Sequence, residues 1–141
     1  MRAISLWQPW ATAVAIGIKQ VETRHWRTEY TGPIAIHAAK RWQKPEREFA
    51  AIEQAAGRLP QILPLGVIVA TAIIYGYQRT EDAEVGEVER IYGNYEPGRF
   101  AWFMRDIVAL DVPIPFAGRQ GFFNVPDAML RRERATTEEE E

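Results

Sequence analysis

The chain has 141 residues, of which 47% are hydrophobic and 26% are charged, and it contains no cysteine. This length and composition are typical of one globular domain, and they exclude a disulfide framework and thiolate metal sites. Two histidines are too few for a structural zinc site, so we expect neither a metal nor a cofactor. No apolar run is long enough to span a membrane, and the N-terminus lacks a signal-peptide pattern, so we expect a cytoplasmic protein that does not contact membranes.

The charge is unevenly distributed along the chain. Removing the four glutamates at 138–141 changes the net charge from −2 to +2. A mildly basic body permits nucleic-acid binding without requiring it. We therefore predict one domain over residues 1–130, followed by a charged, disordered acidic tail over residues 131–141.

The first half of the chain alternates predicted strands with predicted helices. The first helix is apolar nearly all round, which predicts a buried helix, and Gly17 is suited to end it. The strand that follows places Glu22 and Arg24 on one side, whereas Lys19 would point the other way unless the turn after Gly17 redirects it. The predicted elements are strands at 1–6, 20–24 and 33–38 and helices at 8–16 and 45–57.

The second half is dominated by strands. Residues 66–75 are β-branched on both faces, which predicts a central strand covered on both sides. A short helix over 85–91 precedes two separate strands at 100–104 and 107–112, and a last strand covers 122–125. Five to six strands with two to three flanking helices predict an α+β fold whose strands form a small mixed β-barrel.

Lys19, Glu22 and Arg24 place three long charged side chains within six residues, directly after the buried helix. One interpretation is a solvated edge strand with local ion pairs, which contribute up to ~1 kcal/mol each. The other is a polar pocket beside the core. The residues alone leave both interpretations open.

Two further groups of candidate residues include or adjoin indole rings. Trp7 and Gln8 lie in the first strand-to-helix turn, where helical N–H groups can bind an anion. His37 ends a strand that leads into Lys40 and Arg41, and basic residues beside an indole suit a nucleic-acid strand. The plainer alternative is an ordinary surface loop with a structural histidine.

Arg119 and Gln120 lie between two glycines, in a tight turn that could present both side chains to a pocket. No pattern typical of a Ser-His-Asp triad, of paired catalytic carboxylates or of a phosphate-binding glycine loop is readable in the sequence.

Three ordered segments resemble one known family. SLWQPWA at residues 5–11, GIKQVETR at 17–24 and GPIAIHAAK at 32–40 resemble the ASCH domain, the activating-signal-cointegrator homology family. Its hallmark, GxKxxExR, is matched at every fixed position by residues 17–24, and the resemblance covers about residues 3–130. It implies a PUA-like β-barrel, and a cleft between this barrel and the first helix that is lined by the hallmark residues.

The resemblance implies that the partner is RNA, another single-stranded nucleic acid or a nucleoside. Cations would hold phosphates, Glu22 would accept a hydrogen bond from a base, and Trp7 would offer a stacking surface. The oligomeric state is not predicted. The residues expected to contact the ligand are Trp7, Gln8, Lys19, Glu22, Arg24, His37, Lys40, Arg41, Arg119 and Gln120.

Two other functions remain open at this point. Some short ASCH proteins remove the acetyl group of N4-acetylcytidine, and ribonuclease action has been proposed for others; here Lys19 and Glu22 would be the catalytic residues. That amidohydrolase subgroup carries a threonine nucleophile where this chain has Glu22, so Glu22 would instead activate a water molecule. The third function is that of a protein-interaction module in a regulatory complex.

Overall fold

The computed structural model describes residues 1–130, which form six strands and several short helices; the predicted acidic tail lies outside the described residues. The strands are β1 Arg2–Leu6, β2 Val21–Arg24, β3 Gly32–Ala38, β4 Val67–Arg79, β5 Phe100–Pro115 and β6 Phe123–Asn124. The helices are α1 Trp10–Ala15, α2 Lys44–Ala55 and α3 Glu87–Ile91, with a 3-10 helix at Thr80–Asp82.

The strands form one mixed sheet in the order β2-β5-β4-β3-β1-β6. β1 and β3 run parallel, and the other neighbouring pairs are antiparallel. Within residues 1–130 the two outer strands, β2 and β6, are not hydrogen-bonded to each other. The α+β class is therefore confirmed, whereas the predicted closure into a barrel is not.

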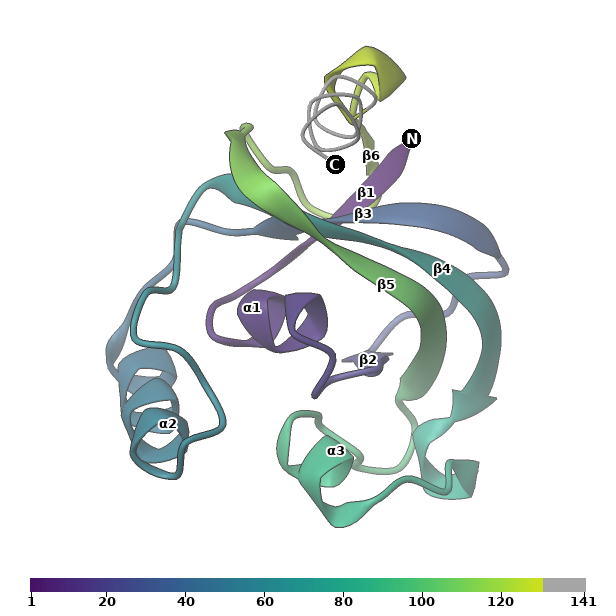
Figure 1. Cartoon of the computed structure of the whole chain (residues 1–141). Coiled ribbons are helices and arrows are strands. Elements are labelled where there is room, and N and C mark those ends of the chain that lie inside the picture. The colour runs from purple at the N-terminus through teal and green to yellow at the C-terminus, as the bar shows by residue number, and fades with distance from the viewer. Residues whose placement is uncertain (131–141) are drawn as a thin grey trace.

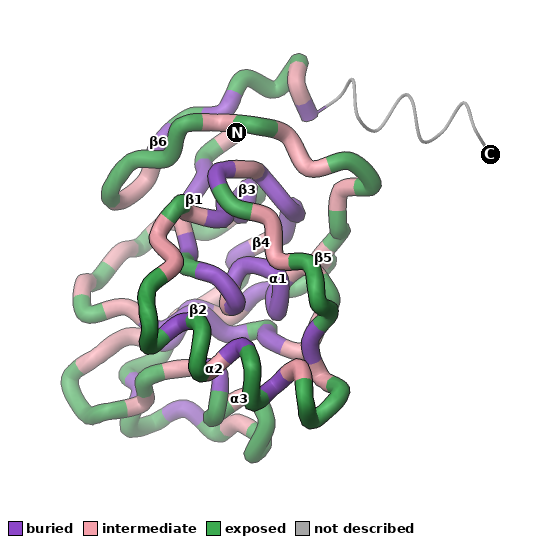
Figure 2. Tube along the Cα trace, turned by 90° about the vertical axis from the view of Figure 1, so that its left-hand side faces the viewer, coloured by how far each residue is buried: buried purple, intermediate pink, exposed green. Residues whose placement is uncertain are grey.

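The core lies between the curved sheet and α1. β4 and β5 bend around α1, which lies on their concave side (Figure 1). Ala11, Ala13 and Val14 of α1 are fully buried, and the helix contacts β3, β4 and β5. Small side chains on α1 let the helix approach the sheet closely, and the buried stretches follow α1 and the central strands (Figure 2). The prediction of a buried, apolar first helix is confirmed.

The structure corrects one strand prediction. Residues 100–104 and 107–112 belong to a single long strand, β5, rather than to two strands. Asp106, with a φ of 51°, marks an irregularity, and the β4–β5 register shifts nearby. Such irregularities bend a strand without ending it, because pairing with the neighbouring strand resumes on both sides. The same pairing extends β4 to Arg79, beyond its predicted end.

A buried carboxylate connects α2 to the segment that follows α3. Glu53 accepts hydrogen bonds from Arg58 Nε at 2.7 Å and from the Tyr92 hydroxyl at 2.7 Å. The Arg58 hydrogen bond lowers the pKa of Glu53, although burial opposes this shift. Phe49 of α2 packs edge-on against Tyr92, so the same contact region fixes an aromatic pair.

No helix of residues 1–130 is long and apolar enough to cross a membrane. No group of three or more His, Asp or Glu side chains in this part of the chain is arranged to hold a metal ion.

Glu53→Gln should reduce the free energy of unfolding at pH 7 by about 1.5–3 kcal/mol, because a charged hydrogen bond to Arg58 is lost. Since the pKa of Glu53 is lowered from 4.5, its stabilisation is complete above pH 4.5 and is lost as the pH falls through the lower, folded-state pKa. Urea unfolding at several pH values should therefore show a difference that shrinks in acid.

The matched control is Glu48→Gln on the same helix, whose exposed pair with Lys44 has an N–O distance of 3.6 Å. Exposed pairs contribute little, so the control should change stability by less than about 0.5 kcal/mol. A difference between wild type and Glu53→Gln that stayed constant from pH 7 to pH 3 would contradict this assignment.

Candidate functional site

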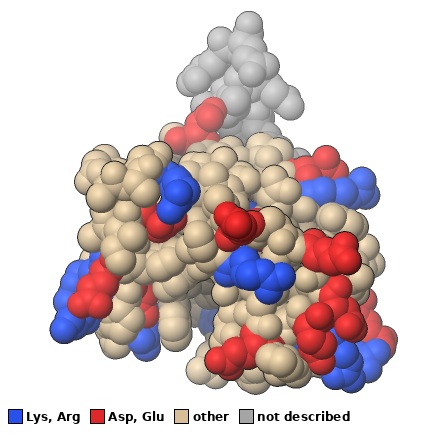
Figure 3. Space-filling view, turned by 90° about the horizontal axis from the view of Figure 1, so that it is seen from below, with Lys and Arg blue, Asp and Glu red and all other residues tan. Residues whose placement is uncertain are grey.

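A cleft of about 1430 Å³ opens between the part of the molecule that carries α2 and the part that carries α3. Seen from below, the surface is hollowed between these two parts (Figure 3). The volume exceeds the roughly 300–1,000 Å³ of ordinary small-molecule pockets, so an extended ligand fits. The lining segments are the β1–α1 junction, β2 and the residues after it, the end of β3, α2, residues 91–94 and the loop at 116–122.

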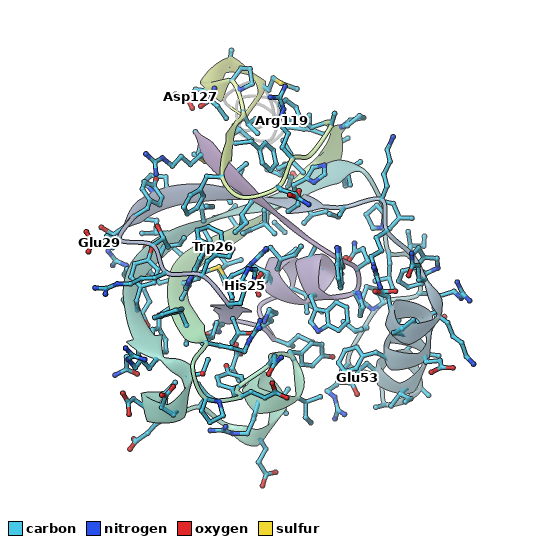
Figure 4. All side chains as sticks on the ribbon, turned by 180° about the vertical axis from the view of Figure 1, so that it is seen from behind. His25, Trp26, Glu29, Glu53, Arg119 and Asp127 are labelled. Atoms are coloured by element: carbon cyan, nitrogen blue, oxygen red, sulfur yellow. The ribbon has the colours of Figure 1, made fainter. Side chains whose placement is uncertain are left out.

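The charge that lines the cleft is mainly positive. One carboxylate, that of Glu22, lines it together with four cationic side chains. In Figure 4, His25 and Trp26 are seen between β2 and the loop that carries Arg119. Positive walls attract anions and raise their local concentration. The cationic residues are Arg24, Lys40, Arg99 and Arg119.

Aromatic rings line the cleft on two sides. On one side, Trp10 stacks on Phe49 with ring centroids 5.2 Å apart, and Phe49 meets Tyr92 at 5.3 Å. On the other, Trp26 meets Phe122 edge-on at 5.4 Å. All five rings lie on the cleft wall, and flat ligands such as bases stack on aromatic side chains.

The octapeptide at 17–24 turns sharply after α1. Gly17 has a φ of 88°, a conformation that glycine adopts readily. The turn redirects Lys19 towards Glu22, with Nζ 3.5 Å from Glu22 Oε1. The three charged side chains therefore do come together, but Lys19 is only 1% exposed and does not line the cleft.

The Lys19 ammonium is enclosed by oxygen atoms. It donates hydrogen bonds to the carbonyl of Val21 at 2.6 Å and to that of Tyr92 at 2.8 Å. Burial lowers the pKa of Lys19, and the nearby carboxylates of Glu22 and Glu89 oppose this shift. The ammonium therefore joins the start of β2 to the segment after α3.

Glu22 is held on both sides. Its Oε2 accepts from Arg24 Nε at 3.0 Å, and its Oε1 accepts from the Thr23 backbone N–H at 3.0 Å while facing Lys19. Arg24 in turn donates through Nη2 to the carbonyl of Ser5 at 2.6 Å. A continuous set of polar contacts thus runs from the buried Lys19 to β1 at the cleft.

His37 lies beside Ser5, where the polar contacts that begin at Lys19 reach β1. Its Nδ1 is 2.8 Å from Ser5 Oγ, and its Nε2 is 2.7 Å from the carbonyl of Phe116. A carbonyl only accepts, so Nε2 carries the proton and the neutral ring leaves Nδ1 as an acceptor. Burial lowers the pKa of His37, with the Phe116 carbonyl acting in the opposite direction. The Ser5 hydroxyl therefore donates to His37 at neutral pH.

Of the other predicted site residues, some line the cleft and others lie outside its wall. Trp7, Lys40, Arg119 and Gln120 line the cleft, as do Glu22, Arg24 and His37. Arg41 does not; its guanidinium lies 4.0 Å above the Trp7 ring and pairs with Glu46 at 2.6 Å.

Gln8 is fully buried and has a structural role instead. Its side-chain amide donates to Thr12 Oγ1 at 2.7 Å and to the carbonyl of Pro64, and its oxygen accepts from the Thr12 N–H. It therefore stabilises the first turn of α1, away from the cleft.

Sequence reasoning missed several lining residues. Ser5 and Trp26 lie inside or beside the motifs that suggested the family, so proximity to these motifs was an available signal. The residues after α3 carried no pattern, because only the tertiary fold brings them to β2. The missed residues include Ser5, Trp10, Trp26, Phe49, Tyr92, Asn94, Arg99 and Phe122.

Comparisons with known proteins bear on the family and on the fold. A model of the ASCH domain matches residues 4–113, and the comparison with curated proteins gives no match. Among solved structures, ASCH from Zymomonas mobilis is 17% identical with a TM-score of 0.58, covering 95% of this chain and 93% of that one. A serine-to-alanine mutant of the Z. mobilis protein is 18% identical with a TM-score of 0.56, covering 96% and 94%.

Lys19→Ala should destabilise the fold by roughly 3–5 kcal/mol, because it leaves the buried carbonyls of Val21 and Tyr92 without their donor and removes one of the two cations that face Glu22. Urea unfolding followed by circular dichroism measures the loss. The control is Lys44→Ala, whose side chain is 78% exposed and should have almost no effect. Wild-type stability in Lys19→Ala would contradict a structural role for this ammonium.

Proposed function

Since the chain belongs to the ASCH domain family, we propose that it binds single-stranded RNA or a nucleoside in the cleft. The observation that carries the proposal is the composition of the cleft wall: it combines four cationic side chains and several aromatic rings with a single carboxylate that is already paired. Cationic side chains bind the phosphates of a nucleic acid, and aromatic rings stack on its unpaired bases.

The cations differ in how they are held, and the difference suits two roles. Arg24 donates to the carbonyl of Ser5 and Arg99 to that of Thr23, so both guanidinium groups are fixed before a ligand arrives. Lys40 and Arg119 form no ion pair among the described residues and remain adaptable. Fixed cations position a phosphate with little loss of conformational freedom, and adaptable ones follow the backbone of a strand.

The rings offer stacking surfaces at more than one point. Trp7 is 48% exposed, and the Arg41 guanidinium lies over its ring. Trp10 and Trp26 lie on the two aromatic walls. Stacking contributes about 1–3 kcal/mol per base and tolerates different sequences, so we expect affinity for single strands with little preference between bases.

The geometry favours binding over hydrolysis by Lys19 and Glu22. The Lys19 ammonium is enclosed by two carbonyls and a carboxylate, and it has no access to the cleft. Glu22 is engaged by Arg24 and by the Thr23 N–H. A general base must reach the proton that it abstracts, and neither group is free to do so.

Combined Lys40→Ala and Arg119→Ala substitutions should weaken binding of a fluorescent single-stranded RNA oligonucleotide. Each phosphate contact contributes about 0.7 to the slope of log K against log salt for a single strand, so the slope should fall by about 1.4. Fluorescence anisotropy at several salt concentrations measures both the affinity and the slope.

The charge-matched control is the double variant Lys44→Ala/Arg105→Ala, which removes two exposed cations that do not line the cleft. It should leave both quantities near their wild-type values. Equal affinity and slope in the wild type and in a folded Lys40→Ala/Arg119→Ala variant would sink the proposal.

A further inference from the structure

We propose that Ser5 and His37 act as a nucleophile and its general base, and that the pair transfers acyl groups from esters that enter the cleft. This activity goes beyond ligand binding and does not require it. It concerns a polar centre that neither Lys19 nor Glu22 contacts.

The geometry of the pair is that of an activated hydroxyl. Ser5 and His37 are direct partners in the parallel register of β1 and β3, so their side chains leave the sheet on the same face. Ser5 Oγ lies 2.8 Å from His37 Nδ1, and the carbonyl of Phe116 holds Nε2 at 2.7 Å. Nucleophile, base and a group that fixes the tautomer of the base are therefore all present.

The environment keeps His37 ready to accept a proton. Burial lowers its pKa, so the ring is neutral at pH 7. Its nearest ring neighbour is Phe123, which packs edge-on with centroids 5.7 Å apart. The adjacent cation is Arg24, which contacts the carbonyl of Ser5. Ser5 and His37 both line the cleft. Ser5 is partly exposed there, whereas His37 is only 2% exposed and lies behind it.

The loop before β6 supplies groups that can stabilise an oxyanion. Gly118 lies directly against the pair, because a Cβ atom there would be 2.5 Å from Ser5 Oγ and 2.5 Å from the His37 ring. Only bare backbone fits at this position. The N–H groups of residues 117–121 have no partner within the described part of the chain. Together with the Arg24 guanidinium, they are the donors available to a tetrahedral intermediate.

The proposed reaction has two steps. Ser5 Oγ attacks the carbonyl carbon of an ester while its proton passes to His37 Nδ1, and the alcohol leaves with that proton. This gives an acyl-serine and a free alcohol. Water, deprotonated by His37, then attacks the acyl-serine and releases a carboxylic acid and the original serine. Because the cleft is lined mainly by cations, the preferred esters carry a negative charge on the acyl or the alcohol part.

The chain offers a direct test, because Ser5 is its only serine. A fluorophosphonate probe should label the intact protein once, at Ser5, as read by intact mass and peptide mapping. His37→Asn should slow labelling at least about 100-fold, the usual minimum contribution of a general base. Absence of labelling in the folded wild-type protein, or labelling that His37→Asn leaves unchanged, would overturn the proposal.

A second experiment does not depend on turnover. The chain has no cysteine, so Ser5→Cys introduces a single thiol whose pKa follows from the pH dependence of alkylation by iodoacetamide. With His37 as base, this pKa should lie below the ordinary value of about 8.5, and His37→Asn should raise it by at least one unit. Ala51→Cys, on the exposed face of α2, is the reference thiol. If the thiol pKa were the same in Ser5→Cys and in Ser5→Cys/His37→Asn, His37 would not act as the base.

Substrate charge provides the last comparison. p-Nitrophenyl hemisuccinate, an anionic ester, should be hydrolysed faster than neutral p-nitrophenyl acetate, and Ser5→Ala should abolish both reactions. Turnover that persists in Ser5→Ala would refute Ser5 as nucleophile. Loss of RNA binding with intact labelling would instead concern only the binding proposal, so the two failures are distinguishable.

Discussion

The buried ammonium of Lys19 is the interaction on which the cleft depends. Removing an ammonium from water is expensive, and it is tolerated only when its hydrogen bonds are satisfied. Here two carbonyls and the Glu22 carboxylate surround it. One carbonyl belongs to β2 and the other to Tyr92 after α3, so satisfying this one charge brings together two walls of the cleft that are 71 residues apart.

The same charge orders the residues that do face the cleft. Glu22 is held between Lys19 and Arg24, and this fixes the Arg24 guanidinium. Arg24 then contacts the carbonyl of Ser5, next to the Ser5–His37 hydrogen bond. The octapeptide at 17–24 therefore serves mainly to position one cation. Lys19 has a structural role, Glu22 links Lys19 to Arg24, and Arg24 presents a fixed guanidinium to the cleft. A threonine in place of Glu22 would leave both cations without this partner.

Sequence reasoning succeeded where local pattern decides the outcome. The apolar first helix and the β-branched central strand follow from periodicity, and the structure places both as expected. The sequence left the direction of Lys19 open, and the turn at Gly17 decides it. Sequence reasoning failed where hydrogen bonding between strands determines the length of a strand. Asp106 interrupts the pattern of β5, yet the β4 ladder continues past it. In an open sheet and in a closed barrel, side chains along each strand alternate between the two faces in the same way. The residue pattern therefore does not distinguish the two architectures.

The candidate site shows the same division. Cations and indoles near the motifs could be identified from the sequence, but their burial could not. From the sequence, the polar side chains of Lys19 and Gln8 are candidates for ligand contact, but in the structure both are buried. Conversely, Ser5 and His37 are 32 residues apart, and only the parallel register of β1 and β3 brings them together. No local signal encodes that register.

The two proposals meet at Arg24. Its guanidinium is fixed by Glu22 and by the Ser5 carbonyl, and it lines the cleft beside the Ser5 hydroxyl. An anionic group bound by Arg24 would therefore place neighbouring atoms of the ligand near Ser5 Oγ. Positioning of this kind can supply a large part of a rate enhancement without further chemistry. A ligand whose phosphate or carboxylate is held by Arg24 would thus have its neighbouring ester group oriented towards the serine.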